Sequence, residues 1–121
     1  MIVMSILLVD DDPEARKTGE VALEAHFDCY VAGSEDALMV AEHEKPHLIL
    51  LDVSSAGLDG FHTLQELKQN PITAGIPVVL MSDNISMHHI ANHQMLAIGI
   101  VEKPFDPSQL PDQLRQIFGH L

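Results

Sequence analysis

The sequence has little positive charge. Lysine and arginine together number 6 among 121 residues, against 18 aspartates and glutamates, which gives a formal net charge of −12. A surface of this sign repels the phosphates of nucleic acids and the headgroups of anionic lipids. We therefore expect no direct nucleic acid binding and no attachment to an acidic membrane.

Cysteine and long apolar runs are also scarce. The single cysteine, Cys29, has no partner for a disulfide within the chain, which is typical of a reducing cytoplasm. No apolar run approaches the roughly 18 residues of a transmembrane helix. The start MIVMSILLVDDD lacks the basic segment of a signal peptide. We predict a cytoplasmic protein without membrane insertion.

Two nucleotide-binding motifs are missing as well. The sequence contains neither G-x-x-x-x-G-K-[ST] nor G-x-G-x-x-G. Nucleotide sites of these two kinds are therefore not expected.

What the sequence does contain is an alternation of short apolar runs with amphipathic segments. Such runs suit strands that are buried on both faces of a parallel sheet. Strands are expected at residues 5–9, 29–32, 48–51, 77–81 and 98–101, and helices at 14–26, 35–44, 60–69, 86–96 and from Asp106 or Ser108 to 118. This order predicts a single α/β domain with a doubly wound, three-layer architecture.

Three residues are interpreted as structural signals at the ends of elements. Asp12 precedes Pro13, a combination of N-cap and first helical residue. Ser34 is expected to cap the second helix, and Asp59 to serve as a turn or cap residue before the third.

Charged and polar side chains follow four of the expected strands. Asp10 and Asp11 follow the first, Asp52 the third, Ser82 the fourth and Lys103 the fifth. These strand ends share one edge of a parallel sheet, where ligands of open α/β sheets bind. Two carboxylates about 4 Å apart repel by ~4 kcal/mol at an effective dielectric constant of ~20. The acidic group should therefore take up a proton or bind a cation, and its oxygen ligands favour Mg²⁺ or Mn²⁺ over zinc.

A neutralised carboxylate at this edge could act as a nucleophile. With a cation and Lys103 nearby, Asp52 could attack a phosphoryl donor. Charge developing on the phosphoryl oxygens would be stabilised by the metal, by Lys103 and by the Ser82 hydroxyl. The Ser82 hydroxyl has an alternative partner in the backbone.

Four segments, LLVDDDP, LILLDVSSAGLDGF, PVVLMSD and VEKPF, together resemble the receiver domains of bacterial two-component response regulators. The resemblance covers essentially the whole chain, residues 1–121, and leaves no output domain within it. It implies a flavodoxin-like (βα)5 fold with parallel strand order 2-1-3-4-5.

The resemblance also assigns roles to single residues. Asp52 would be the phosphoacceptor, and Ser82 and Lys103 would complete the catalytic side chains, with a cis peptide between Lys103 and Pro104. The implied ligands of Mg²⁺, with Mn²⁺ as an alternative, are Asp11, Asp10 through water, Asp52 and the Ser54 carbonyl group.

A receiver domain of this kind would be a signalling switch rather than an enzyme, since it catalyses only its own phosphorylation and dephosphorylation. The implied phosphoryl donors are a sensor histidine kinase or a histidine phosphotransferase. Output would pass through protein contacts on the surface of the last two helices and the fifth strand. Candidate contact residues there are Ile90, Met95, Ile100 and Phe105.

Several positions depart from the usual receiver pattern. Ser54-Ser55-Ala56 replaces a loop that often contains proline, Asp83 follows the switch hydroxyl, and Ile100 stands where receivers usually have an aromatic residue. These departures leave open an alternative, an atypical receiver that binds partners without phosphorylation.

Two further alternatives are weaker. A phosphatase of the haloacid dehalogenase type usually needs a second aspartate two residues after its nucleophile, where this chain has Ser54. Among the eight histidines, His88, His89 and His93 have a spacing that some zinc sites use, but solvent-exposed side chains are the preferred interpretation.

Overall fold

A computed structural model describes residues 3–53, 59–82 and 96–119 of the chain. Five parallel strands form one sheet: β1 (Ser5–Val9), β2 (Asp28–Ala32), β3 (Leu48–Asp52), β4 (Val78–Ser82) and β5 (Gly99–Glu102). The helices are α1 (Pro13–Glu24), α2 (Ala37–Glu44), α3 (Asp59–Gln69) and α5 (Leu110–Phe118). The strand order is β2-β1-β3-β4-β5, which confirms the predicted doubly wound, flavodoxin-like sheet.

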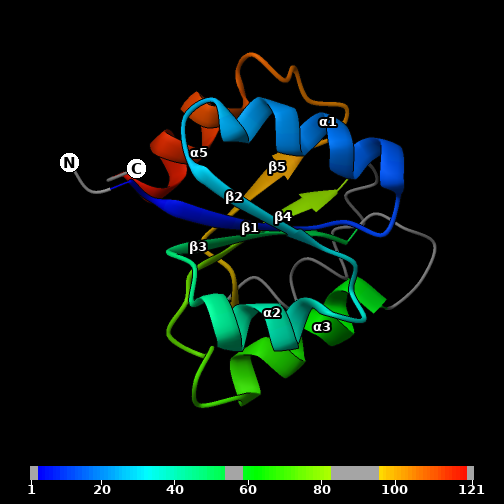
Figure 1. Cartoon of the computed structure of the whole chain (residues 1–121), viewed down its shortest axis with the longest axis vertical. Coiled ribbons are helices and arrows are strands. Elements are labelled where there is room, and N and C mark those ends of the chain that lie inside the picture. Colours follow the sequence, from blue (N-terminus) through cyan, green and yellow to red (C-terminus); the bar gives the residue numbers. More distant parts are fainter. Residues whose placement is uncertain (1–2, 54–58, 83–95, 120–121) are drawn as a thin grey trace.

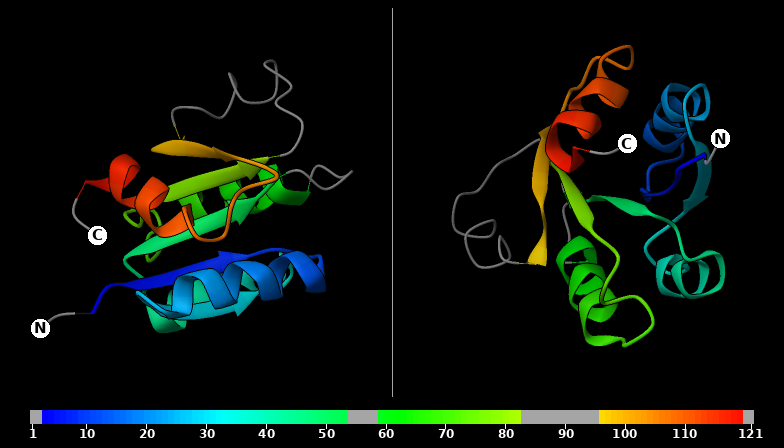
Figure 2. Two further views of the ribbon diagram at one scale, coloured as in Figure 1. Left: turned by 90° about the horizontal axis from the view of Figure 1, so that it is seen from above. Right: turned by 90° about the vertical axis from the view of Figure 1, so that its left-hand side faces the viewer.

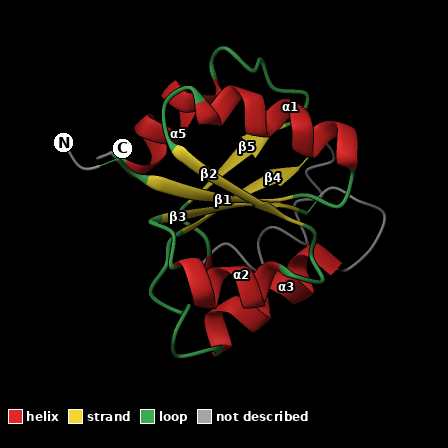
Figure 3. Ribbon diagram, in the orientation of Figure 1, coloured by secondary structure: helices red, strands yellow, loops and turns green. Residues whose placement is uncertain are grey.

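The helices cover the sheet on both sides. Helices α1 and α5 lie on one face, and α2 and α3 lie on the other (Figures 1 and 3). The two turned views in Figure 2 show the same three layers. Among the helices of the described ranges, none is long and apolar enough to cross a membrane.

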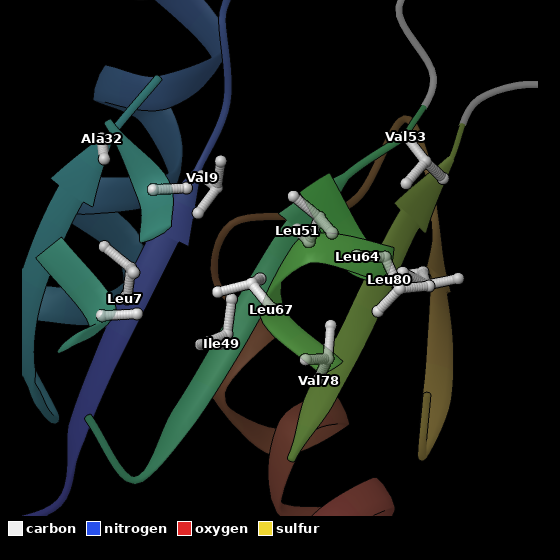
Figure 4. Close-up of a cluster of buried hydrophobic side chains, with 12 residues drawn as sticks. Leu7, Val9, Ala32, Ile49, Leu51, Val53, Leu64, Leu67, Val78 and Leu80 are labelled. Carbon is white, nitrogen blue, oxygen red and sulfur yellow. The ribbon is translucent and has the colours of Figure 1, made fainter. Parts of the chain in front are cut away.

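The core is divided by the sheet into two clusters, because successive side chains of a strand point to opposite faces. In β3, Leu48 and Leu50 contribute to the cluster under α1 and α5, whereas Ile49 and Leu51 contribute to the cluster under α2 and α3. All four are fully buried. Figure 4 shows the second cluster, in which Leu64 and Leu67 of α3 lie against the strands.

The helix starts agree with the sequence in one case and differ in three. Asp12 caps α1 as predicted, accepting a hydrogen bond of 3.1 Å from the Glu14 amide. The predicted cap at Ser34 is wrong, because α2 begins only at Ala37 and Ser34 binds another side chain. Asp59, expected as a turn or cap residue before the third helix, is itself the first residue of α3. The last helix begins at Leu110, later than predicted.

Several predicted features lie outside the described residues. They are the helix at 86–96 up to residue 95, Ser54 with Ser55 and Ala56, Asp83, Ile90, Met95 and the group His88, His89 and His93.

Candidate functional site

The candidate site lies at the C-terminal edge of the sheet, where β1 and β3 meet. Asp52 is the last residue of β3, Asp10 follows β1 and Lys103 follows β5. Backbone hydrogen bonds extend the strand pattern to these positions: the Asp10 amide donates to the Ala32 carbonyl over 3.0 Å, and the Lys103 amide to the Ser82 carbonyl over 2.8 Å. The strands β1 and β3 are neighbours in the sheet, but the chain leaves β1 toward one face and β3 toward the other (Figure 1). Sheets of this kind bind ligands at such a switch point.

Lys103 brings the two buried carboxylates together. Its Nζ lies 3.2 Å from Oδ2 of Asp10 and 3.2 Å from Oδ2 of Asp52. The side chains of Asp10, Asp52 and Lys103 are 1%, 6% and 14% exposed. The sequence therefore predicted correctly that these three side chains meet, although they are 42 or more residues apart along the chain.

The backbone of the loop after β1 also holds Asp10 in place. Its second carboxylate oxygen, Oδ1, accepts a hydrogen bond of 3.0 Å from the Asp12 amide. Its carbonyl oxygen accepts one of 3.2 Å from Nη1 of Arg16 on α1. The turn that caps α1 thus also orients the Asp10 carboxylate toward Lys103.

Two carboxyl groups face a single ammonium ion in this group. The pKa of Asp10 is raised, mainly by burial and also by the neighbouring Asp52. The hydrogen bond from the Asp12 amide and the charge of Lys103 act in the opposite direction but do not cancel the rise. Burial acts to lower the pKa of Lys103, but Asp52 and Asp10 outweigh it, so that the net shift is upward. Lys103 therefore stays an ammonium ion, and two carboxylates share one cation.

Asp11, the predicted direct metal ligand, has turned elsewhere. It is exposed, and its Oδ1 accepts a hydrogen bond of 2.8 Å from the Ser34 amide, while Oδ2 accepts one of 2.7 Å from the Ser34 hydroxyl. It lines a cleft of about 490 Å³ together with residues of the segment after β2 and of α3, among them Glu35 and His62. The site contact of Ser34 was missed by sequence reasoning, although its position just after β2 places it on the same edge.

The donors that are present fit a hard divalent cation. Within the described ranges, no three acidic, histidine or cysteine side chains converge as a metal cluster. Asp10 and Asp52 nevertheless offer carboxylate oxygens in a buried place with an excess of negative charge, which is the ligand chemistry of Mg²⁺.

The remaining predicted residues that the structure describes lie in or just after β4 and β5. Ser82 is buried at the end of β4, in register with Glu102 of β5. The Lys103–Pro104 peptide is cis, which confirms the expectation. Ile100 is partly buried in β5 against the cluster under α2 and α3.

Comparison with known proteins agrees with this geometry. The family model described as "Response regulator receiver domain" matches residues 6–115. The "Phosphate regulon transcriptional regulatory protein PhoB" of Pseudomonas aeruginosa is 32% identical over 120 residues, covering 97% of this chain and 52% of the relative. "Response regulator Rre1" of Synechocystis is 30% identical over 120 residues, covering 96% and 52%. The chain thus spans about half the length of the curated relatives it matches.

Solved structures share the fold. The Vibrio cholerae chemotaxis protein CheY4 superimposes with a TM-score of 0.85 at 22% identity, covering 96% of this chain and 99% of that one. A response regulator from Desulfuromonas acetoxidans gives a TM-score of 0.81 at 29% identity, covering 98% of both chains. The chain belongs to the family of response regulator receiver domains, whose members act in two-component signalling.

Proposed function

We propose that this domain is a phosphoryl-accepting switch in which Asp52 receives the phosphoryl group from a histidine kinase or a histidine phosphotransferase. The observation that carries the proposal is the contact of Lys103 with both Asp52 and Asp10 at the switch point of the sheet. A carboxylate paired with a lysine in a buried place is held in one orientation and keeps its charge. The residues 1–121 are proposed to act as one receiver domain.

The reaction would be a transfer to one oxygen of Asp52. The carboxylate oxygen forms a bond to phosphorus while the phosphorus–nitrogen bond of the phosphohistidine breaks, and its electron pair returns to the imidazole. Lys103 lies where it can pair with the incoming phosphoryl oxygens as they displace its contact with Asp52. Water later attacks the acyl phosphate and restores Asp52, so the domain would catalyse only its own phosphorylation and dephosphorylation.

Mg²⁺ would be held by Asp10, Asp11 and Asp52, with the Ser54 carbonyl as an additional ligand and Mn²⁺ as a substitute. The bound cation supplies positive charge for the phosphoryl oxygens. The protein itself contributes the two buried carboxylates and the ammonium group of Lys103, all of which lie at or just after the ends of strands.

Ser82 would report the state of Asp52. It is buried at the end of the strand next to β3, and its carbonyl oxygen accepts the hydrogen bond from the Lys103 amide. A phosphoryl group on Asp52 would offer its hydroxyl a charged acceptor. Movement of β4 and β5 would then reach a protein partner at the proposed face of β5 and the last two predicted helices. Ile100 there is partly buried, and Phe105 packs against the cluster under α1 and α5.

The test is labelling with acetyl phosphate in the presence of Mg²⁺, read by intact mass. We expect the wild type to gain one phosphoryl group, Asp52→Asn to gain none and EDTA to prevent the gain. Asp106→Asn is the matched control, since Asp106 is an exposed carboxylate outside the site. A wild-type protein that never gains the group, with acetyl phosphate or with a phosphorylated histidine phosphotransferase, would instead favour the alternative of a partner-binding module without phosphorylation.

A further inference from the structure

The contact between Asp11 and Ser34 suggests how the affinity for the metal is set. We propose that Ser34 is a positioning residue that holds Asp11 away from Asp10 and Asp52 and thereby weakens Mg²⁺ binding. The inference rests on the proposed function in one respect, because it takes Asp11 as a ligand of Mg²⁺. Nothing in it requires that Asp52 be phosphorylated.

Both carboxylate oxygens of Asp11 are engaged by the same residue. The Ser34 amide donates to Oδ1 over 2.8 Å, and the Ser34 hydroxyl donates to Oδ2 over 2.7 Å. Hydrogen bonds to an ionised carboxylate are shorter and stronger than those between neutral groups. Asp11 therefore has a defined alternative to the metal site.

The segment after β2 is built for this contact. A Cβ atom at Gly33 would lie 2.9 Å from Oδ1 of Asp11, so a side chain there would push the carboxylate away. The Gly33 carbonyl accepts a hydrogen bond of 3.2 Å from the Asp36 amide, which closes the turn. Because α2 begins only at Ala37, the Ser34 hydroxyl has no helix amide to cap and is available for Asp11.

Asp11 does not join the acidic pair: among the described residues, no three acidic, histidine or cysteine side chains converge as a metal cluster. Asp11 lines the cleft that Glu35, His62 and Glu66 also line, and neither Asp10 nor Asp52 is part of that lining. To share a cation with Asp10 and Asp52, the Asp11 carboxylate must turn and give up its contacts with Ser34. Mg²⁺ binding is therefore coupled to release of the segment between β2 and α2.

The chain contains a matched control for the loss of the hydroxyl. Ser108 also donates its amide and its hydroxyl to one carboxylate, that of Asp106, although both reach the same oxygen: the amide donates to Oδ1 over 2.9 Å and the hydroxyl over 2.8 Å. Both serines are at least partly exposed, so both alanine variants should fold. Of these two serines, Ser34 is the one that contacts a residue of the proposed metal site.

The experiment is a Mg²⁺ titration of the full chain by calorimetry. We expect Ser34→Ala to raise the association constant about three- to tenfold, because one hydrogen bond to a charged group no longer opposes the metal. Ser34→Thr, which keeps the hydroxyl, should bind Mg²⁺ like the wild type, and so should Ser108→Ala.

A second measurement follows the contact itself. In ¹⁵N-resolved NMR spectra, the amide proton of Ser34 should move upfield as Mg²⁺ saturates the wild-type protein, because it loses its charged acceptor. The amide proton of Ser108 should not move.

The outcomes separate the two proposals. An unchanged or lower Mg²⁺ affinity of Ser34→Ala, or a Ser34 amide that does not respond to Mg²⁺, overturns the positioning role. If Ser34→Ala binds Mg²⁺ more tightly while neither protein is phosphorylated on Asp52, the positioning role stands and the proposed function fails.

Discussion

The ammonium nitrogen of Lys103 lies 3.2 Å from Oδ2 of Asp52, at the same distance as it lies from Oδ2 of Asp10. One cation from the end of β5 thus joins carboxylates from the ends of β3 and β1. Asp10 and Asp52 repel each other where water cannot screen them. The chemistry of the site and the stability of the sheet edge therefore depend on the same contact.

Replacing Lys103 by methionine should destabilise the protein when no divalent cation is present. We expect the free energy of unfolding to fall by about 1–3 kcal/mol, below the full cost of breaking a buried ion pair, because an Asp10–Asp52 pair without its cation can take up a proton. Urea unfolding in EDTA measures the loss.

Adding Mg²⁺ should restore part of the stability of Lys103→Met, since a bound cation replaces the missing charge. The control is Lys17→Met, because Lys17 is 71% exposed in its pair with Glu20 and such pairs contribute roughly 0–1 kcal/mol. If both variants lose equal stability, Lys103 is not the main counter-charge of the site.

Gly60 at the start of α3 is a second point where the fold and the site depend on each other. A Cβ atom at this position would lie 2.7 Å from the Asp52 carbonyl oxygen and 2.7 Å from the Val53 Cα atom. These are backbone atoms, which cannot move aside as the end of a side chain can. We expect Gly60→Ala to cost about 1–3 kcal/mol of stability by overpacking and to slow the labelling of Asp52.

Chemical unfolding and the rate of labelling by acetyl phosphate measure these two effects. Gly75→Ala is the matched control, because a Cβ atom there meets nothing within 4 Å. A Gly60→Ala protein as stable as Gly75→Ala, with normal labelling, would show that α3 shifts away from β3 without cost.

The fold and the meeting of the site carboxylates could be predicted because both follow from strand patterns. The run Leu48–Leu51 is apolar at every position, as a strand buried on both faces requires. In a parallel sheet the carboxyl ends of all strands lie on the same edge, so Asp10, Asp52 and Lys103 could be placed on one edge, and the strand order decides which of them are near each other. The order of the strands came from the resemblance to a family, since alternation alone allows several orders.

The direction of the Asp11 side chain could not be predicted in this way. Spacing places Asp11 at the sheet edge but does not choose its rotamer. From its position in the sequence, Ser34 is assigned to the amides of a following helix, and a carboxylate from another strand end is not considered as its partner. The start of α2 at Ala37 leaves the carboxylate as the partner of Ser34.

The last prediction concerns Cys29 on the edge strand β2. Burial, together with the nearby Glu20 and Glu24, raises the pKa of its thiol from 9.0 to about 12. The unfolded chain loses this proton near pH 9, whereas the folded protein keeps it, so the folded state binds more protons between pH 9 and 12. The free energy of unfolding should therefore fall as the pH rises through this range.

Urea unfolding of the wild type and of Cys29→Ala between pH 7.5 and about 10.5 measures this dependence. The decline above pH 9 should be shallower in Cys29→Ala, while the raised pKa values of Tyr30 and Lys103 leave part of the decline in both proteins. At pH 8 the wild-type thiol should also react with a disulfide reagent far more slowly than free cysteine, because little thiolate is present. Fast labelling at pH 8, together with parallel pH profiles of the two proteins, would mean that Cys29 is neither buried nor surrounded by acids in solution.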